Sequence, residues 1–355
     1  MDFTYDETQH AVAALAATVL RSEPDHTRAD HAFASDAGYD ETLWKAMAQA
    51  GLLALALPAE LGGDGFGAVE VGAVLTEVGR QIQPVPALAT LALGVLPIVA
   101  SGNTDAQRRL LPEVADGRIL TGALRDAHGT NATATADADG FVLNATKVGV
   151  PYAVQAHRVL VATDGGLFAV DPHAAGATAT RTPSASGAPE YTLRLDGVRV
   201  GAADLITTGI GPAQRYAVAG ALAVADGVVA GALALTAAHV RTREQFDKPL
   251  ATFQAVAGQI ADVYITGRTV NLAALSAAWR LDQQLEADDE IEVGAYWLAA
   301  EVPTALQTCH HLHGGLGVDR TYPLHRYYSH AKDLARFVGG AQARLDQIGA
   351  WCSSN

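Results

Sequence analysis

The chain has 355 residues, of which 49% are apolar and 17% are charged, and this is enough apolar material for two or three domains. The formal net charge of −14 and the lack of a clustered lysine-arginine tract exclude a nucleic-acid or anionic-membrane surface, because phosphate groups need neutralising cations. The two cysteines, Cys309 and Cys352, are far apart, so we expect neither a disulfide framework nor a thiolate metal site. The acidic N-terminus is not followed by an apolar run, so we expect no secretory signal and a cytoplasmic setting.

Residues 1–118 are predicted to form an α-helical domain. Apolar residues recur with the helical period at 9–20, 41–53, 68–81 and 104–115, and a proline-interrupted apolar segment at 85–100 indicates a buried helix. Gly63-Asp-Gly65-Phe-Gly-Ala68 formally matches a dinucleotide-binding fingerprint. That fingerprint requires a strand leading directly into the first glycine, whereas Pro58-Ala-Glu-Leu-Gly precedes it here, so we expect an ordinary loop between helices.

Residues 119–206 are predicted to form a compact antiparallel β domain. Short alternating runs separated by Gly, Asp, Asn and Pro indicate strands at 132–136, 141–143, 158–162, 167–170, 191–195 and 198–200. The segment 174–189 is rich in Ala, Thr, Ser and Gly, and we expect it to be a surface excursion because strand-like sequence resumes after it.

Residues 207–355 are predicted to form a four-helix bundle, with helices at 213–243, 252–281, 289–312 and 322–351 and a break at His313-Gly-Gly-Leu-Gly317. The segment 217–238 is apolar enough to suggest a membrane span. Asp226 lies near its centre, however, and a carboxylate in mid-bilayer is costly, so a buried bundle helix is expected. Helices, then strands, then helices predict an α+β multidomain fold.

The stretch from Arg241 to Gln254 concentrates arginine, glutamine and phenylalanine between two long apolar segments. Guanidinium groups pair with phosphate oxygens and aromatic faces stack on flat rings, so this stretch suits a planar, phosphate-bearing ligand. Charged residues are also common at ordinary solvated helix ends, and the residues alone leave both interpretations open.

Several landmarks, taken in order, resemble the acyl-CoA dehydrogenase family over essentially the whole chain. They are Pro58-Ala-Glu-Leu-Gly-Gly63, Asn144-Ala-Thr-Lys147, Arg243-Glu-Gln-Phe-Asp-Lys-Pro-Leu250 with Phe253-Gln254, and His310-His-Leu-His-Gly-Gly-Leu-Gly317 followed by Tyr322-Pro-Leu-His-Arg326. The resemblance implies an N-terminal α-helical domain, a central β domain and a C-terminal four-helix bundle, assembled as a dimer of dimers with FAD at a subunit interface.

The resemblance also implies which residues contact the FAD of the neighbouring subunit. On the pyrophosphate and adenosine side these are Arg243, Gln245, Phe246, Phe253 and Gln254, and along the ADP moiety they are His311, Leu312, His313, Gly314 and Gly315. The alternative for the histidines His310, His311 and His313 is a capped helix end, and no metal site is expected because, apart from Cys309, no cysteine or carboxylate has matching helical spacing.

Family members carry their catalytic glutamate in one of two positions, and both are apolar here. The position near the C-terminus matches Val338 in Phe337-Val-Gly-Gly340, and the early position in the first bundle helix matches Ala217. The segment that holds flavin and substrate in the family reads Leu124-Arg-Asp-Ala-His-Gly129, and Val-Gly-Val-Pro-Tyr152 follows Lys147. A base is required to remove the proton α to the thioester, so the resemblance implies no catalytic residue in this chain.

The resemblance is strongest to the non-catalytic subunits of α2β2 steroid side-chain acyl-CoA dehydrogenases, which share Tyr322-Pro-Leu-His-Arg-Tyr-Tyr328 and Gly339-Gly340. It implies a homologous catalytic partner subunit that binds most of the acyl-CoA, and an electron-transfer acceptor. Two alternatives stay open. One is a self-sufficient homotetramer with a relocated base, Asp226 or Asp262, and the other is a non-enzymatic scaffold subunit that does not touch FAD.

Overall fold

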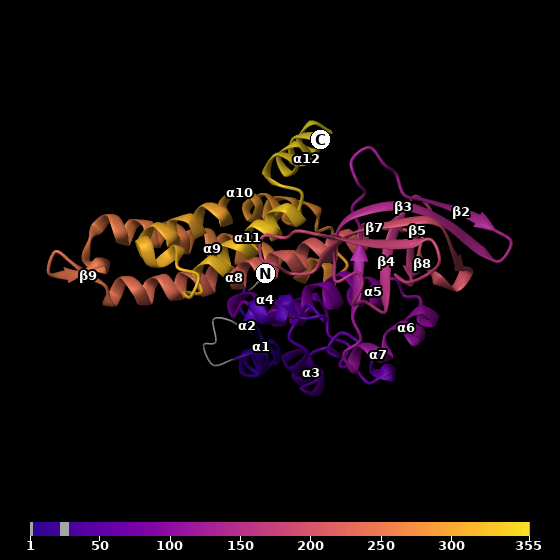
Figure 1. Ribbon diagram of the computed structural model, residues 1–355, viewed down its shortest axis with the longest axis horizontal. Helices are drawn as coiled ribbons and strands as arrows, with labels where there is room; N and C mark the ends of the chain where they lie inside the picture. The colour runs from indigo at the N-terminus through magenta and orange to yellow at the C-terminus, as the bar shows by residue number, and fades with distance from the viewer. Residues whose placement is uncertain (1–2, 22–27, 355) are drawn as a thin grey trace. The chain divides into compact units, whose positions relative to one another are not determined.

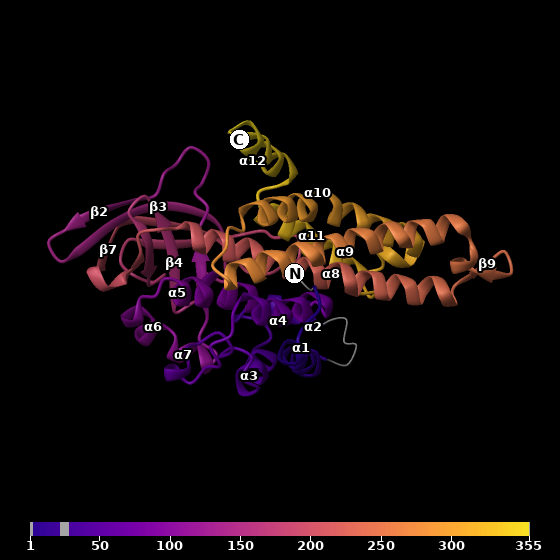
Figure 2. The same cartoon turned by 180° about the vertical axis from the view of Figure 1, so that it is seen from behind.

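The computed structural model describes residues 3–21 and 28–354, and Figures 1 and 2 show it from opposite sides. The chain forms two compact units, one made of residues 1–28, 72–83 and 218–355, the other of residues 29–71 and 84–217. The N-terminal helical segment is therefore divided between the two units. The second unit also contains the two four-stranded β-sheets, and the first contains most of the helical segment that follows them.

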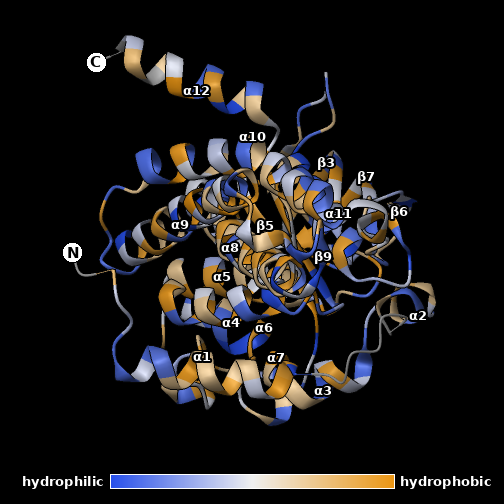
Figure 3. Ribbon diagram, turned by 90° about the vertical axis from the view of Figure 1, so that its left-hand side faces the viewer, coloured by the Kyte–Doolittle hydropathy of each residue, from blue (hydrophilic) through white to orange (hydrophobic). Residues whose placement is uncertain are grey.

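The N-terminal segment is helical, as the periodicity predicts. Its helices are α1 (Glu7–Leu20), α2 (Arg28–Ala34), α3 (Glu41–Gln49), α4 (Ala68–Arg80), α5 (Leu96–Ala100), α6 (Thr104–Leu110) and α7 (Pro112–Ala115), with a 3₁₀ turn η1 (Ala59–Leu61) and a π-helical stretch η2 (Leu88–Val95). Asp6 starts α1 with a capping box to Gln9, so two backbone donors at the helix end are satisfied. On α3, Leu43, Trp44 and Met47 are buried, and hydrophilic residues alternate with them along the ribbon (Figure 3).

Two four-stranded sheets follow, with orders β1-β4-β5-β8 and β2-β3-β7-β6. Their strands are β1 (Leu120–Ala123), β2 (Thr133–Asp137), β3 (Gly140–Pro151), β4 (Arg158–Thr163), β5 (Gly166–Val170), β6 (Ala177–Thr182), β7 (Glu190–Gly201) and β8 (Leu205–Thr207). Phe141 and Phe168 meet edge to face with ring centroids 5.0 Å apart, which packs β3 against β5.

Three features of these sheets differ from the sequence prediction. β1 pairs in parallel with β4, although the other strand pairs in the described residues are antiparallel. All four residues of β1 are buried, so the strand lacks the alternation by which strands are recognised. β6 lies inside the expected excursion 174–189, and β7 joins two predicted strands into one.

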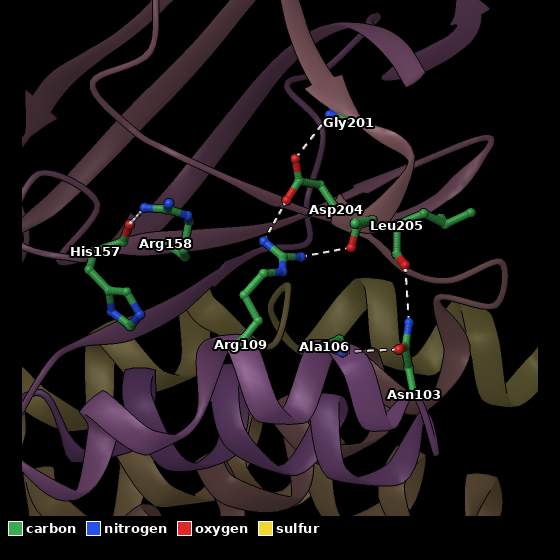
Figure 4. A network of polar contacts seen from close by, with 9 residues as sticks. Asn103, Ala106, Arg109, His157, Arg158, Gly201, Asp204 and Leu205 are labelled. Atoms are coloured by element: carbon green, nitrogen blue, oxygen red, sulfur yellow. Dashed lines mark hydrogen bonds and ion pairs between the residues drawn. The ribbon is translucent and has the colours of Figure 1, made fainter. Parts of the chain in front are cut away.

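A polar network ties α6 to the end of β7 within the second unit (Figure 4). Arg109 donates to the Asp204 carboxylate and to the Ala203 carbonyl, both at 2.7 Å. The amide of Asn103, which caps α6, donates to the Leu205 and Ile206 carbonyls. These bonds satisfy backbone groups where the chain passes from β7 to β8.

The C-terminal segment is a helical bundle. It contains α8 (Gly211–Thr242), α9 (Gln254–Asp282), α10 (Asp288–His313) and α11 (Leu324–Phe337), with a 3₁₀ stretch η5 (Gly314–Val318) after α10. The predicted fourth helix, 322–351, is wrong in one respect: α11 ends at Phe337, and α12 (Ala341–Ser354) begins after Gly339 and Gly340, whose φ angles are 95° and 85°. Left-handed backbone at two successive residues ends a helix.

Helices α4 and α8 cross with their backbones in direct contact. A Cβ on Gly227 would lie 1.9 Å from the Thr76 carbonyl oxygen, and a Cβ on Gly79 would lie 2.1 Å from the Val224 carbonyl oxygen. The Thr76 hydroxyl donates to the Ala223 carbonyl at 3.1 Å across the same contact. Glycine at these positions therefore allows an approach that any side chain would prevent.

This crossing gives a stability prediction. Gly227→Ala should lower the free energy of unfolding by about 3 kcal/mol, because the new methyl group cannot fit without moving the backbone. Gly258→Ala on α9 is the matched control, because no atom lies within 4 Å of its Cβ position, and it should stabilise by about 0.5–1 kcal/mol. Chemical denaturation of both variants checks this, and equal effects would contradict the crossing.

Candidate cofactor half-site

The stretch between α8 and α9 is a two-residue β-hairpin. Its strands are β9 (Glu244–Gln245) and β10 (Lys248–Pro249), and the Leu250 amide donates to the Arg243 carbonyl at 2.8 Å to close its base. Phe246 and Asp247 form the turn with φ angles of 54° and 62°. Turns of this type favour glycine and asparagine, and a bulky residue at positive φ is strained. The strained residue here is an aromatic one.

Phe246 is also the most exposed large hydrophobic residue in the described part of the chain, at 85%. Its ring lies edge to face with Phe253 at 6.1 Å, and the Lys248 ammonium lies 4.3 Å from the centre of the Phe253 ring. Arg243, Gln245 and Gln254 are exposed beside them. The hairpin therefore presents aromatic faces and cations together on one exposed surface. Figure 1 shows the hairpin, labelled β9, where α8 ends and α9 begins.

The second predicted segment lies at the end of α10. His311, Gly314 and Gly315 are exposed, whereas Leu312 and His313 are buried. Gly314 has φ 59° and ψ −135°, a conformation that is essentially restricted to glycine. The side chains of Leu312 and His313 are turned into the bundle, so a ligand at this surface meets the backbone at Gly314 and Gly315.

The structure joins these two segments through a contact that the sequence analysis did not identify. The rings of His239, on the last turn of α8, and His313 stack with centroids 4.4 Å apart and 18° between their planes. The only sequence signal for this contact is the position of His239, four residues before Arg243. The base of the Arg243 hairpin and the end of α10, which precedes Gly314 and Gly315, are therefore in contact.

Val338 is buried at the end of α11, beside an ion pair between Arg344 and Glu292. Its carbonyl accepts a hydrogen bond from Arg344, whose guanidinium also donates to both Glu292 carboxylate oxygens at 2.9 and 3.0 Å. Ala217, the other candidate position, is buried in α8. Both positions hold apolar side chains, and neither can accept a proton.

The segment 124–152 is organised around a buried lysine. The Lys147 ammonium, 1% exposed, lies 2.7 Å from the Asp126 carboxylate. Burial lowers the pKa of Lys147, and Asp126 offsets part of that effect. Gly149 has φ 69°, and its Cβ position lies 2.9 Å from the Arg125 guanidinium. Charged side chains of this chain thus determine the backbone conformation of this segment.

Comparison with known proteins assigns the family. The family model for the N-terminal domain of acyl-CoA dehydrogenases matches residues 5–118, and the model for the C-terminal domain matches residues 214–352. The chain belongs to the acyl-CoA dehydrogenase family. The fold predicted from the sequence, helical at both ends with β-sheets between, is confirmed.

Several acyl-CoA dehydrogenases are similar over almost the whole chain. FadE28 of Mycobacterium tuberculosis is 45% identical over 99% of both chains, and FadE27 of the same organism is 32% identical over 98% of both. Among solved structures, the Tcur3481-Tcur3483 steroid ACAD G363A variant has a TM-score of 0.90 at 35% identity, covering 98% of both chains. The ChsE4-ChsE5 complex from Mycobacterium tuberculosis has a TM-score of 0.90 at 31% identity, covering 100% of both.

FAD is the cofactor of acyl-CoA dehydrogenases, and the described residues fit one part of it. The guanidinium of Arg243 suits phosphate, and the rings of Phe246 and Phe253 suit adenine. The open glycine backbone at Gly314 and Gly315 suits the close approach of a ligand. The apolar positions Val338 and Ala217 do not suit the chemistry at the flavin ring. The fit is therefore to the adenosine-diphosphate half of the molecule.

The two carboxylates considered as a relocated base lie on α8 and α9. Asp226 accepts a hydrogen bond from Asn271 at 3.0 Å between these helices, and burial raises its pKa. Asp262 is exposed on α9.

Three other features considered in the sequence are the dinucleotide-binding fingerprint, a metal site and a membrane span. Gly63 follows η1 and not a strand, and its Cβ position lies 2.2 Å from the Leu57 carbonyl oxygen, so this glycine serves packing. Within residues 3–21 and 28–354, no group of three His, Cys, Asp or Glu side chains is placed to hold a metal. In the same residues, α8 alone is long and apolar enough to cross a membrane, and 72% of its most apolar window is buried inside the protein.

The strained turn gives a prediction about stability. Asp247→Gly should raise the free energy of unfolding by about 1 kcal/mol, because glycine adopts positive φ without the steric cost that other residues bear. Phe246→Gly should not lower stability either, since its ring is largely exposed. Thermal denaturation checks both, and a large loss of stability in Phe246→Gly would show that the ring serves packing within this chain.

Proposed function

We propose that this chain is a subunit of a heteromeric FAD-dependent acyl-CoA dehydrogenase. It lacks the catalytic glutamate and completes the FAD site of a homologous catalytic subunit in an α2β2 assembly. The observation that carries the proposal is an asymmetry within one chain. Arg243, Gln245 and Phe246, which we assign to the adenosine side, are exposed at a strained hairpin, whereas Val338, at the position that we assign to the base, is a buried valine.

Further proposals accompany it. The substrate is the CoA thioester of a steroid side chain, which is supported by the similarity to a structure described as a steroid ACAD and to the two-component ChsE4-ChsE5 complex. The complex is cytoplasmic and passes electrons to an electron-transfer acceptor. We also propose the domain boundaries 1–118, 119–206 and 207–355 for this chain.

In this assembly the roles of the residues follow from their chemistry. FAD, when bound, accepts the hydride that leaves the β-carbon, and the partner supplies the base for the α-proton. In this chain, Arg243 pairs with the FAD phosphates, and Phe246 and Phe253 pack against its adenosine portion. Gly314 and Gly315 let the backbone approach the diphosphate. The substrate thioester is handled by the partner.

The flavin content of the complex tests the proposal. The chain is co-expressed with homologous acyl-CoA dehydrogenase genes from its own genomic neighbourhood, and the complex is purified. We expect about one FAD per two chains, and little FAD when the chain is purified alone, because each site needs residues from both subunits. One FAD per chain, or acyl-CoA turnover by this chain alone, would support a self-sufficient homotetramer instead.

Substitution at the hairpin separates the proposal from a scaffold role. Arg243→Ala and Phe246→Ala should each weaken FAD retention by about tenfold or more, since each removes a charge-assisted or stacking contact of about 1.4 kcal/mol or more. Lys45→Ala, at an exposed residue of α3, is the matched control. Unchanged flavin content in both hairpin variants would favour the scaffold.

Restoring only the carboxylate should not restore catalysis. Val338→Glu would place one acid in a buried site beside the Arg344–Glu292 ion pair, while the segment 124–152 still lacks the family pattern. We therefore expect no dehydrogenation of acyl-CoA by this variant alone, with an artificial electron acceptor. Measurable turnover would mean that this chain retains a working flavin-ring site.

A further inference from the structure

The stacked imidazoles of His239 and His313 connect the two segments of the half-site. The His239 carbonyl accepts a hydrogen bond from the Arg243 amide at 2.8 Å, so His239 lies at the base of the hairpin. His313 directly precedes Gly314 and is 5% exposed. One ring thus belongs to each segment, and their near-parallel contact fixes the distance between the segments.

Hydrogen bonds hold His313 in one neutral form. Its Nδ1 lies 2.8 Å from the Cys309 carbonyl oxygen, which can only accept, so Nδ1 carries the proton. Its Nε2 then accepts from the Tyr322 hydroxyl at 3.1 Å. A second proton on His313 would disturb this arrangement, and a proton on His239, which is only partly buried, would place a cation against the His313 ring.

The groups around the His239–His313 pair either disfavour a positive charge on these rings or are neutral. They are Arg243 at the end of α8, His310 and the Cys309 thiol on α10, and Tyr322 after η5. Burial, then His313 and Arg243, lower the pKa of His239, and burial lowers the pKa of His313. Both rings are therefore neutral at neutral pH.

We propose that His239 and His313 are positioning residues whose neutral stack holds the Arg243 hairpin and the Gly314–Gly315 turn in register, so that both grip the same cofactor. The inference rests on the proposed function. A proton on His239 places a cation against His313 and beside Arg243, and the stack opens. FAD retention should therefore weaken as the pH falls. This effect arises in this chain and is independent of the partner's catalytic groups.

The sign of the pH effect follows from the lowered pKa values. The folded pair binds fewer protons than free histidine between the lowered pKa and about 6.5, so its stabilising effect is complete above that range. It is lost as pH falls from about 6.5 toward the lowered pKa. Raising the pH above about 7 should change nothing.

Two substitutions at His239 distinguish the effect of ring stacking from the effect of protonation. His239→Phe keeps a planar ring that cannot be protonated, and His239→Ala removes the ring. FAD dissociation constants of the co-purified complex are measured at about pH 8 and about pH 5.5. His10→Ala, at an exposed histidine of α1, is the control, and circular dichroism verifies folding.

We expect FAD binding by the wild-type complex to weaken about tenfold between the two pH values, and His239→Phe to remove most of that change. His239→Ala should bind about tenfold more weakly at both. The proposal is overturned if wild type and His239→Phe show the same pH dependence and His239→Ala binds normally; if His239→Ala does not fold, the comparison with His239→Phe decides. Unchanged FAD in Arg243→Ala would instead overturn the proposed function, so the two failures are distinct.

Discussion

The chain reverses direction between β9 and β10 in a turn of two residues, and the half-site depends on it. The hairpin connects helices of 32 and 29 residues, and a turn this short requires positive φ at both Phe246 and Asp247. Each such angle costs about 1–2 kcal/mol in a residue other than glycine. The packing of the two helices, through contacts such as Asp226–Asn271, holds the turn in this conformation. The consequence is an aromatic ring held outside the bundle.

The placement of glycine in the chain shows that this strain serves a purpose. At the α4–α8 crossing, Gly79 and Gly227 are present because a side chain would collide with a carbonyl group. At the hairpin, where glycine would relieve the backbone, the sequence has Phe246 and Asp247 instead. Packing does not explain an aromatic residue that is 85% exposed. Strained, exposed residues of this kind concentrate at binding sites, where the ring contacts something outside its own chain.

The sequence was sufficient for the long helices, and the predicted site residues stay a prediction. The starts and ends of α1, α8, α9 and α10 follow from periodicity, capping residues and glycine, all of which act locally. β1 was missed because burial on both faces removes the alternation of polar and apolar residues, and the break before α12 was missed because its Val338-Gly-Gly340 signal was assigned to the family's catalytic segment. The His239–His313 stack joins residues 74 positions apart, and no local pattern reports such a contact.

The distribution of function between subunits follows from what a shared site requires. In a homo-oligomer every chain must carry both the base and the residues that reach the neighbour's cofactor, because each chain plays both parts. This chain has an exposed, strained aromatic residue and an exposed arginine at the hairpin, and apolar residues at the two positions proposed for the base. Selection for a homo-oligomeric enzyme would not tolerate the second feature, and a chain released from cofactor binding altogether would have no use for the first. A partner that supplies the base, and needs the arginine and the ring, accounts for both.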